Sequence, residues 1–137
     1  DPSIVAQLSR TAYGKSSRYH RFKKTNDAII AILINTLTLL IGPVNRFQEE
    51  LIYKKEIEEF FSYVEEIQLP EGNLFERLKL LQLKGAFDLK CGDKEAGEAK
   101  LRQSIQILND LGANGIANNT TIYLEQILSY INIANSK

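Results

Sequence analysis

One asparagine lies deep inside an apolar stretch, where its amide could bind a peptide backbone. Asn35 interrupts the run from residue 28 to residue 41, and Thr38 follows it by one helical turn. An asparagine side chain can donate to a peptide C=O and accept from a peptide N–H at the same time. An unpaired buried amide costs about 1 to 3 kcal/mol, so Asn35 needs a partner. Either a neighbouring helix backbone or a bound peptide could supply it.

A second group of polar and aromatic side chains lies near the C-terminus. Steps of four, three and four residues place the group on one side of a helix. Tyrosines interspersed with amides are typical of surfaces that bind peptides, although a solvated face or a dimer contact fits the same pattern. By analogy with groove positions of helical repeats, Lys79 and Gln82 are further candidates. The group consists of Asn119, Tyr123, Gln126 and Tyr130.

Catalytic and metal chemistry finds little support. His20 is the single histidine and Cys91 the single cysteine, which argues against catalytic triads and excludes multi-histidine metal sites and an internal disulfide. A catalytic Cys91–His20 pair would need two residues from distant, unrelated parts of the sequence. The glutamates between residues 49 and 66 alternate with apolar residues and are typical of a solvated face. No glycine-rich phosphate loop is present. We therefore expect no enzyme activity, no cofactor and no metal site.

Composition and charge indicate one soluble domain over residues 1–137. Apolar residues make up 44% and charged residues 25%, as in ordinary globular proteins. The 17 basic and 17 acidic side chains cancel, so no global field attracts the chain to DNA or to an anionic membrane. The basic segment 14–24 could contact DNA phosphate or an acidic partner, or be a solvated connection. The apolar run of about 14 residues is shorter than the roughly 20 needed to span a membrane, and we expect a cytoplasmic protein.

Helical periodicity accounts for nearly the whole chain, and no segment has a strand pattern. Proline and glycine signals predict about six helices, with the structure of residues 14–24 left open. The expected ranges are 1–13, 25–41, 47–67, 73–91, 93–111 and 115–134.

One stretch has the length of a tetratricopeptide repeat, 34 residues from Leu78 to Leu111. Gly85 and Gly97 fall in the middle of its two helices, where each glycine costs about 1 kcal/mol relative to alanine. A close crossing of the two helices would explain both glycines. We therefore predict an all-α fold of antiparallel hairpins in a tetratricopeptide-like right-handed solenoid.

The stretch from Leu69 to Gly112 resembles the C-terminal domain of the Rgg/GadR/MutR family of Gram-positive transcriptional regulators. The resemblance rests on Leu69-Pro70 before Leu74-Phe75-Glu76, on residues 80–85, on Ser104 to Leu108, and on Leu111-Gly112. The apolar residues 32–35 with their asparagine also fit the family, and the resemblance covers roughly residues 26–133.

The resemblance implies a cytosolic homodimeric regulator that takes part in quorum sensing. In such a protein a helical domain binds a short signalling peptide in its concave groove. DNA is contacted only through an N-terminal helix-turn-helix, which we expect to be missing from this chain because the sequence starts directly in a helix at Asp1. The alternative is a generic tetratricopeptide-like scaffold that docks a protein tail.

Overall fold

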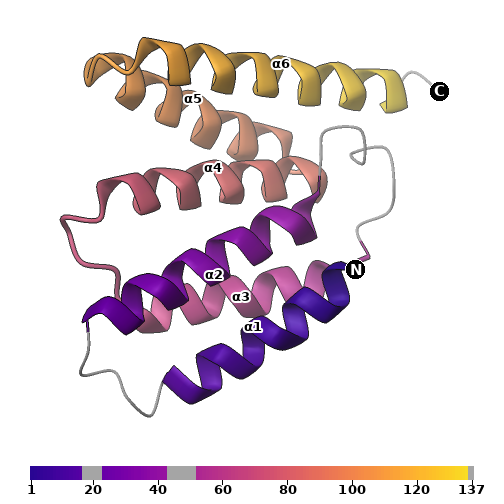
Figure 1. The fold of residues 1–137 in the computed structure, drawn as a ribbon. Helices are drawn as coiled ribbons and strands as arrows, with labels where there is room; N and C mark the ends of the chain where they lie inside the picture. Colours follow the sequence, from indigo (N-terminus) through magenta and orange to yellow (C-terminus); the bar gives the residue numbers. More distant parts are fainter. Residues whose placement is uncertain (17–22, 43–51, 136–137) are drawn as a thin grey trace. The chain divides into compact units, whose positions relative to one another are not determined.

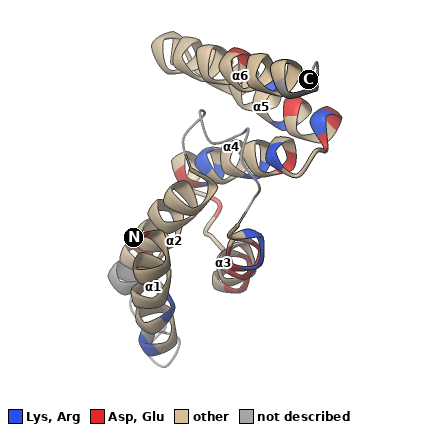
Figure 2. Ribbon diagram, turned by 90° about the vertical axis from the view of Figure 1, so that its right-hand side faces the viewer, with Lys and Arg blue, Asp and Glu red and all other residues tan. Residues whose placement is uncertain are grey.

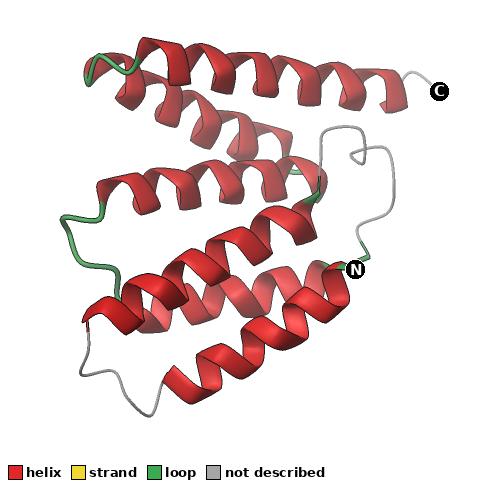
Figure 3. Cartoon of the chain, in the orientation of Figure 1, coloured by secondary structure: helices red, strands yellow, loops and turns green. Residues whose placement is uncertain are grey.

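The computed structural model describes residues 1–16, 23–42 and 52–135, which contain six helices and no strand (Figures 1 and 3). The prediction of an all-α chain with about six helices is therefore confirmed for the described residues, whereas the right-handed solenoid stays a prediction. The helices are α1 (Pro2–Ser16), α2 (Lys23–Ile41), α3 (Lys54–Ile67), α4 (Leu74–Lys90), α5 (Lys94–Asp110) and α6 (Asn114–Asn135).

The helices belong to two compact units. The first comprises residues 1–41 and 53–77, with α1, α2, α3 and the first turn of α4. The second comprises residues 42–52 and 78–137, with the rest of α4, α5 and α6. Each unit has its own buried apolar core, and each is described separately below.

Most helix ends lie where capping residues and glycines in the sequence predicted them. The Asp1 carboxylate accepts from the backbone N–H of Ser3 at 3.0 Å, and that of Asp93 accepts from Ala96 at 3.3 Å, as expected of N-caps. Gly42, Gly92 and Gly112 follow α2, α4 and α5 with φ values of 83°, 94° and 78°. Only glycine adopts this left-handed conformation without strain, so these three residues end their helices.

Two predicted boundaries differ from the structure. The segment left open contributes to two helices, because α1 continues to Ser16 and α2 begins at Lys23; residues 17–22, with His20, lie outside the described residues. Of the helix expected over residues 47–67, residues 47–51 lie outside the described residues; in the described part α3 begins at Lys54, after a turn at residues 52–53. Ile52 is 76% exposed, so it does not belong to the buried face that suggested the earlier start.

In the first unit, α2 packs against both α1 and α3. Its buried residues include Leu33 and Leu37, and Ile57 and Phe60 of α3 are fully buried. One polar contact lies in this core: Ser9 and Thr36, both buried, are joined by a hydrogen bond of 2.5 Å. The Thr36 hydroxyl donates to the Ile32 carbonyl at 2.7 Å, so Ser9 is the donor to Thr36. None of the helices in the described residues is long and apolar enough to cross a membrane.

In the second unit, α4 and α5 form the hairpin that the two glycines predicted. A methyl group added to Gly97 would lie 2.6 Å from the Gly85 carbonyl oxygen and 2.8 Å from the Leu89 nitrogen. The backbones thus touch with no side chain between them. Asp88 forms an ion pair with Lys100 across the same hairpin. Leu111, the last residue of the predicted 34-residue stretch, follows the end of α5 by one residue and is 69% exposed.

Candidate functional site

Gln82 of α4 connects all three helices of the second unit. Its side-chain nitrogen lies 3.2 Å from the Thr120 hydroxyl of α6 and 3.5 Å from the Ser104 hydroxyl of α5. Ser104 is fully buried and Thr120 is 9% exposed, whereas Gln82 itself is half-buried. The sequence pointed to Gln82 only as a residue facing a groove, and gave no sign of the two hydroxyls that hold it.

The two helices α4 and α6 run in the same direction (Figure 1). Gln82 of α4 contacts Thr120 of α6, and one cluster of buried residues contains both Leu89 of α4 and Ile127 of α6. Leu101 of α5 lies in the same cluster. In the second unit α4 and α6 are therefore neighbours of the same direction, separated in sequence by α5.

The predicted stripe on α6 lies beside the contact with Gln82. Asn119 and Gln126 are exposed, whereas Tyr123 and Tyr130 are half-buried. Tyr123 packs against the buried cluster, and this burial raises the pKa of its phenol to about 12. At neutral pH Tyr123 is a protonated hydrogen-bond donor. Gln82 therefore contacts, at Thr120, the helix that carries the stripe. Lys79 is exposed and lies one turn before Gln82 on α4.

The other two candidates, Asn35 and Thr38, belong to the first unit. Both are exposed on α2, so the expectation that Asn35 is buried is wrong. The apolar run has one solvent-facing side, where Ile32 and Leu39 are 37% and 49% exposed. Thr38 donates to the Ile34 carbonyl at 2.9 Å, as a helical threonine commonly does. The Asn35 amide is accessible to a ligand, and peptide binding there stays a prediction.

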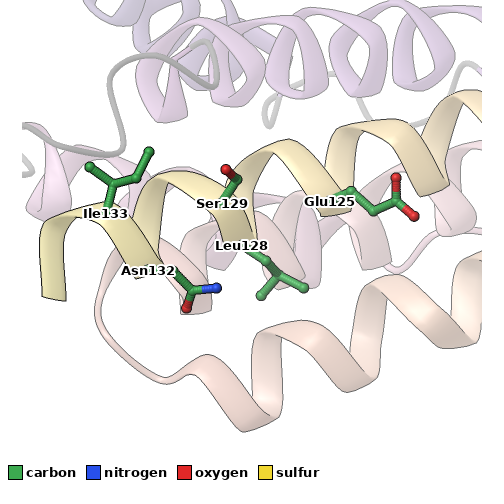
Figure 4. A pocket seen from close by; sticks show the side chains of 5 residues that line it. All are labelled: Glu125, Leu128, Ser129, Asn132 and Ile133. Carbon is green, nitrogen blue, oxygen red and sulfur yellow. The ribbon is translucent and has the colours of Figure 1, made fainter. Parts of the chain in front are cut away.

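A shallow pocket of about 480 Å³ lies along the C-terminal half of α6 (Figure 4). Figure 4 shows Leu128 and Asn132 on one side of the helix and Ser129 and Ile133 on the other. Glu125, at the edge of this pocket, is the single charged residue in the 22 residues of α6 (Figure 2). Apart from Glu125, which is exposed, the exposed side chains described on α6 are therefore uncharged polar or apolar.

Sequence reasoning missed a cluster that links α1 to α3. Arg10 binds the Glu59 carboxylate through two nitrogens, at 2.6 and 3.0 Å, and its guanidinium lies 5.9 Å from the centre of the Phe60 ring. These hydrogen bonds lower the pKa of Glu59. Tyr63 also donates to Glu59. The sequence suggested that all the glutamates of α3 belong to a solvated face. Glu59 does not, because Arg10 and Tyr63 bind its carboxylate.

Tyr13 completes this cluster at the C-terminal end of α1. Its ring stacks on that of Tyr63, with centroids 4.2 Å apart, and its hydroxyl donates to Glu66. Burial and, to a smaller extent, the hydrogen bond to Glu66 raise the pKa of Tyr13 to about 12. The spacings Arg10–Tyr13 and Glu59–Tyr63–Glu66 were visible as helical neighbours, but nothing in the sequence paired segments about 50 residues apart. We assign this cluster a structural role.

In the described part of the chain, residues suited to metal binding form no cluster. Within the described ranges, no group of three or more His, Cys, Asp or Glu side chains is arranged to hold a metal ion. Cys91 is exposed at the turn between α4 and α5.

The described residues form a helical fold in which polar contacts link α1 to α3, and α4 to both α5 and α6. The family model described as "HTH-type transcriptional regulator Rgg, C-terminal domain" matches residues 1–122, so the chain belongs to this family of regulatory domains. The match includes α1, which lay outside the stretch that carried the resemblance. Comparisons with curated proteins and with solved structures gave no match.

Proposed function

We propose that this chain is the peptide-binding and dimerisation domain of an Rgg-type transcriptional regulator that acts in the cytoplasm. It has no catalytic role in this proposal. Its regulatory class follows from the family, and the parallel direction of α4 and α6 is the observation that carries the peptide-binding part. DNA binding belongs to a helix-turn-helix domain elsewhere in the regulator.

The parallel direction of the neighbouring helices α4 and α6 supports a tetratricopeptide-like arrangement. In such repeats the first helices of successive hairpins run parallel as neighbours, and together they line an extended concave surface. Here α4 and α6 take the places of two first helices, and α5 that of the second helix, crossing α4 at the two glycines. A peptide along this surface would meet Lys79 and Gln82 from α4, and from α6 the stripe of Asn119, Tyr123, Gln126 and Tyr130.

The exposed amide of Asn35 and the neighbouring Thr38 are a separate candidate contact for a peptide backbone, on the first unit. A short peptide loses about 1 to 2 kcal/mol of backbone freedom per residue on binding. Hydrogen bonds to its backbone are therefore needed to give register as well as affinity. Amide side chains provide such bonds independently of the peptide sequence.

Regulation follows if the peptide binds one arrangement of the helices better than another. Binding then shifts the population toward that arrangement, and the same free-energy difference changes the affinity of the regulator for DNA. The effect is allosteric and needs no covalent step.

The outer face of α6, which is the exposed side that carries Ile122 and Ile133, supports dimerisation. Ile122 and Ile133 are both 45% exposed, and Glu125 is the single charge of the helix. Depletion of charge combined with exposed apolar side chains is typical of the centre of a protein interface. A second copy of the chain is the partner that this proposal assigns to the face.

Affinity selection with a pool of random synthetic linear octapeptides tests the proposal. We expect a subset to be retained by the domain, and the same peptides to shift the DNA affinity of the full-length regulator. Retention without any change in DNA affinity would favour the second candidate, a tetratricopeptide-like scaffold that docks a protein tail. If no octapeptide is retained, the peptide-binding function is wrong.

A further inference from the structure

The orientation of the Gln82 amide is decided by the two hydroxyls that it meets. The Ser104 hydroxyl donates to the Leu101 carbonyl at 2.7 Å, and the Thr120 hydroxyl donates to the Ile116 carbonyl at 3.0 Å. Each hydroxyl has one hydrogen, which these bonds use, so toward Gln82 both can only accept. The NH2 group must therefore face them, because the opposite orientation would bring the amide oxygen against two oxygens without an available hydrogen.

This orientation leaves the other end of the amide without a partner. Both N–H groups of Gln82 point at Thr120 and Ser104, and no hydrogen bond to its oxygen Oε1 is found among the described residues. In that part of the chain no buried side-chain nitrogen or oxygen lacks a partner. Since Oε1 has none, it is at least partly exposed to solvent.

We propose that Gln82 Oε1 is a fixed acceptor for one backbone N–H of the bound peptide, held in place by Thr120 and Ser104 as positioning residues. This inference rests on the proposed peptide-binding function and identifies one anchor of that site. A free glutamine would have to give up its rotamer freedom when the peptide binds. Here the folded protein has already fixed the side chain, so the hydrogen bond costs less to form.

The local charge favours a neutral donor over a cation. The ammonium group of Lys79 lies on the same helix, three residues before Gln82, and Lys79 is exposed. Residues three apart are neighbours on a helix surface, so a lysine, an arginine or a free N-terminus at Oε1 would be repelled. A backbone N–H is not repelled, and the peptide carbonyl beside it can accept from Lys79. The chemistry therefore selects an extended backbone segment.

Ester substitution in the peptide tests this anchor directly. The probe is the tightest binder from a pool of octapeptides with acetylated N-termini and amidated C-termini. It is remade as a set in which each backbone N–H in turn is replaced by an ester oxygen. In the wild-type domain one ester should bind roughly 5- to 10-fold more weakly, as expected for the loss of one net hydrogen bond. In Gln82→Met the same ester should bind as well as its parent peptide.

A matched pair of variants tests the positioning role. Thr120→Val removes the hydroxyl that holds Gln82, so the parent peptide should bind more weakly and the sensitivity to the ester should diminish. Thr121 donates the same kind of bond, to the Ala117 carbonyl at 2.9 Å, but no bond to Gln82. Thr121→Val should therefore leave both readouts unchanged, provided that circular dichroism shows both variants to be folded.

The outcomes separate this anchor from the broader proposal. If octapeptides bind, and Gln82→Met shows the same loss with every ester as the wild type, the anchor is wrong and the peptide-binding function stands. If Thr120→Val and Thr121→Val behave alike, Thr120 is not a positioning residue. If no octapeptide binds the wild-type domain, the proposed function itself is overturned, together with the anchor.

Discussion

At the scale of single residues, Gly97 leaves less room for an added methyl group than Gly85 or Gly115. An alanine there would place its Cβ 2.6 Å from the Gly85 oxygen and 2.8 Å from the Leu89 nitrogen, both of them backbone atoms that cannot rotate away. Overpacking typically costs about 1 to 3 kcal/mol, and the better helix propensity of alanine returns about 1 kcal/mol. We therefore expect Gly97→Ala to lower the free energy of unfolding by up to about 2 kcal/mol in urea denaturation.

Two other glycines provide the comparison. A Cβ on Gly115 meets no atom within 4 Å, so Gly115→Ala should leave stability unchanged or raise it slightly. Gly85→Ala should fall between the two, because its closest contacts are at 3.0 Å. A Gly97→Ala protein as stable as the Gly115→Ala protein would show that the two helices can separate without cost.

Asn35, unlike the closely packed Gly97, is exposed to solvent. Asn35→Ala should therefore leave the melting temperature nearly unchanged, because surface substitutions usually change stability by less than about 0.5 kcal/mol. If the amide binds a peptide backbone, affinity for selected octapeptides should fall roughly 5- to 10-fold. Calorimetric titration paired with thermal melts measures both quantities, and unchanged affinity would remove Asn35 from the site.

At the scale of helices, the ion pair between Arg10 and Glu59 should make the packing of α1 on α3 sensitive to acid. The hydrogen bonds from Arg10 hold the pKa of Glu59 below its ordinary value. A carboxylate with a lowered folded-state pKa stabilises the fold above its unfolded pKa of roughly 4.3, and this contribution is lost as the pH falls through the folded-state value. Both side chains are partly exposed, 44% and 31%, so the contribution at pH 7 should be at most about 1 kcal/mol.

Glu59→Gln tests this dependence. The variant should be less stable than the wild type at pH 7. The difference should shrink as the pH falls below roughly 4.3 and disappear only below the lowered folded-state pKa of Glu59, where Glu59 is protonated in the wild type. Glu58→Gln, one residue away and exposed, is the matched control and should show a smaller difference at pH 7. An equal gap between wild type and Glu59→Gln at both pH values would contradict the assignment.

The sequence predicted elements better than it predicted which sides of them are buried. Helix ends at Gly42, Gly92 and Asp93 were predictable because caps and left-handed turns depend on the nearest few residues. The start of α3 was not, since Tyr53 makes no side-chain cap that could mark it. The burial of Asn35 was misjudged because apolar neighbours on a helix do not tell which side faces solvent.

The candidate site shows the same division between local and distant information. Helical spacing was enough to place the polar stripe of α6 on one side of a single helix. The partners of Gln82 and Arg10 could not be found in this way, because they lie 38 and 49 residues away along the chain. Contacts of that range depend on how helices pack, and one sequence does not specify this.

At the scale of the whole molecule, the outer face of α6 should decide the oligomeric state. A lysine at Ile122 or Ile133 would place a charge in the centre of the proposed interface, where an unpaired charge is costly. We therefore expect Ile122→Lys and Ile133→Lys to sediment as monomers of 15.5 kDa, and the wild type at about twice that mass.

Ile116 supplies the control for this experiment. It is 50% exposed on the same helix, but it is rotated by about 120° around the axis from Ile122, at 100° per residue. Ile116→Lys adds the same charge to an equally apolar and accessible position, so it should leave the mass unchanged. A monomeric wild type at high concentration would show that the face has another partner.

The contact between Gly85 and Gly97 also has a consequence for amide hydrogen exchange. Where side chains separate two helices, small rotamer changes can open a local gap that admits water. Here the backbones meet directly, so no such gap can form unless the helices move apart along their length. Amides around the crossing should therefore exchange only through cooperative opening of the whole α4–α5 hairpin, whereas those at the end of α6 exchange by fraying.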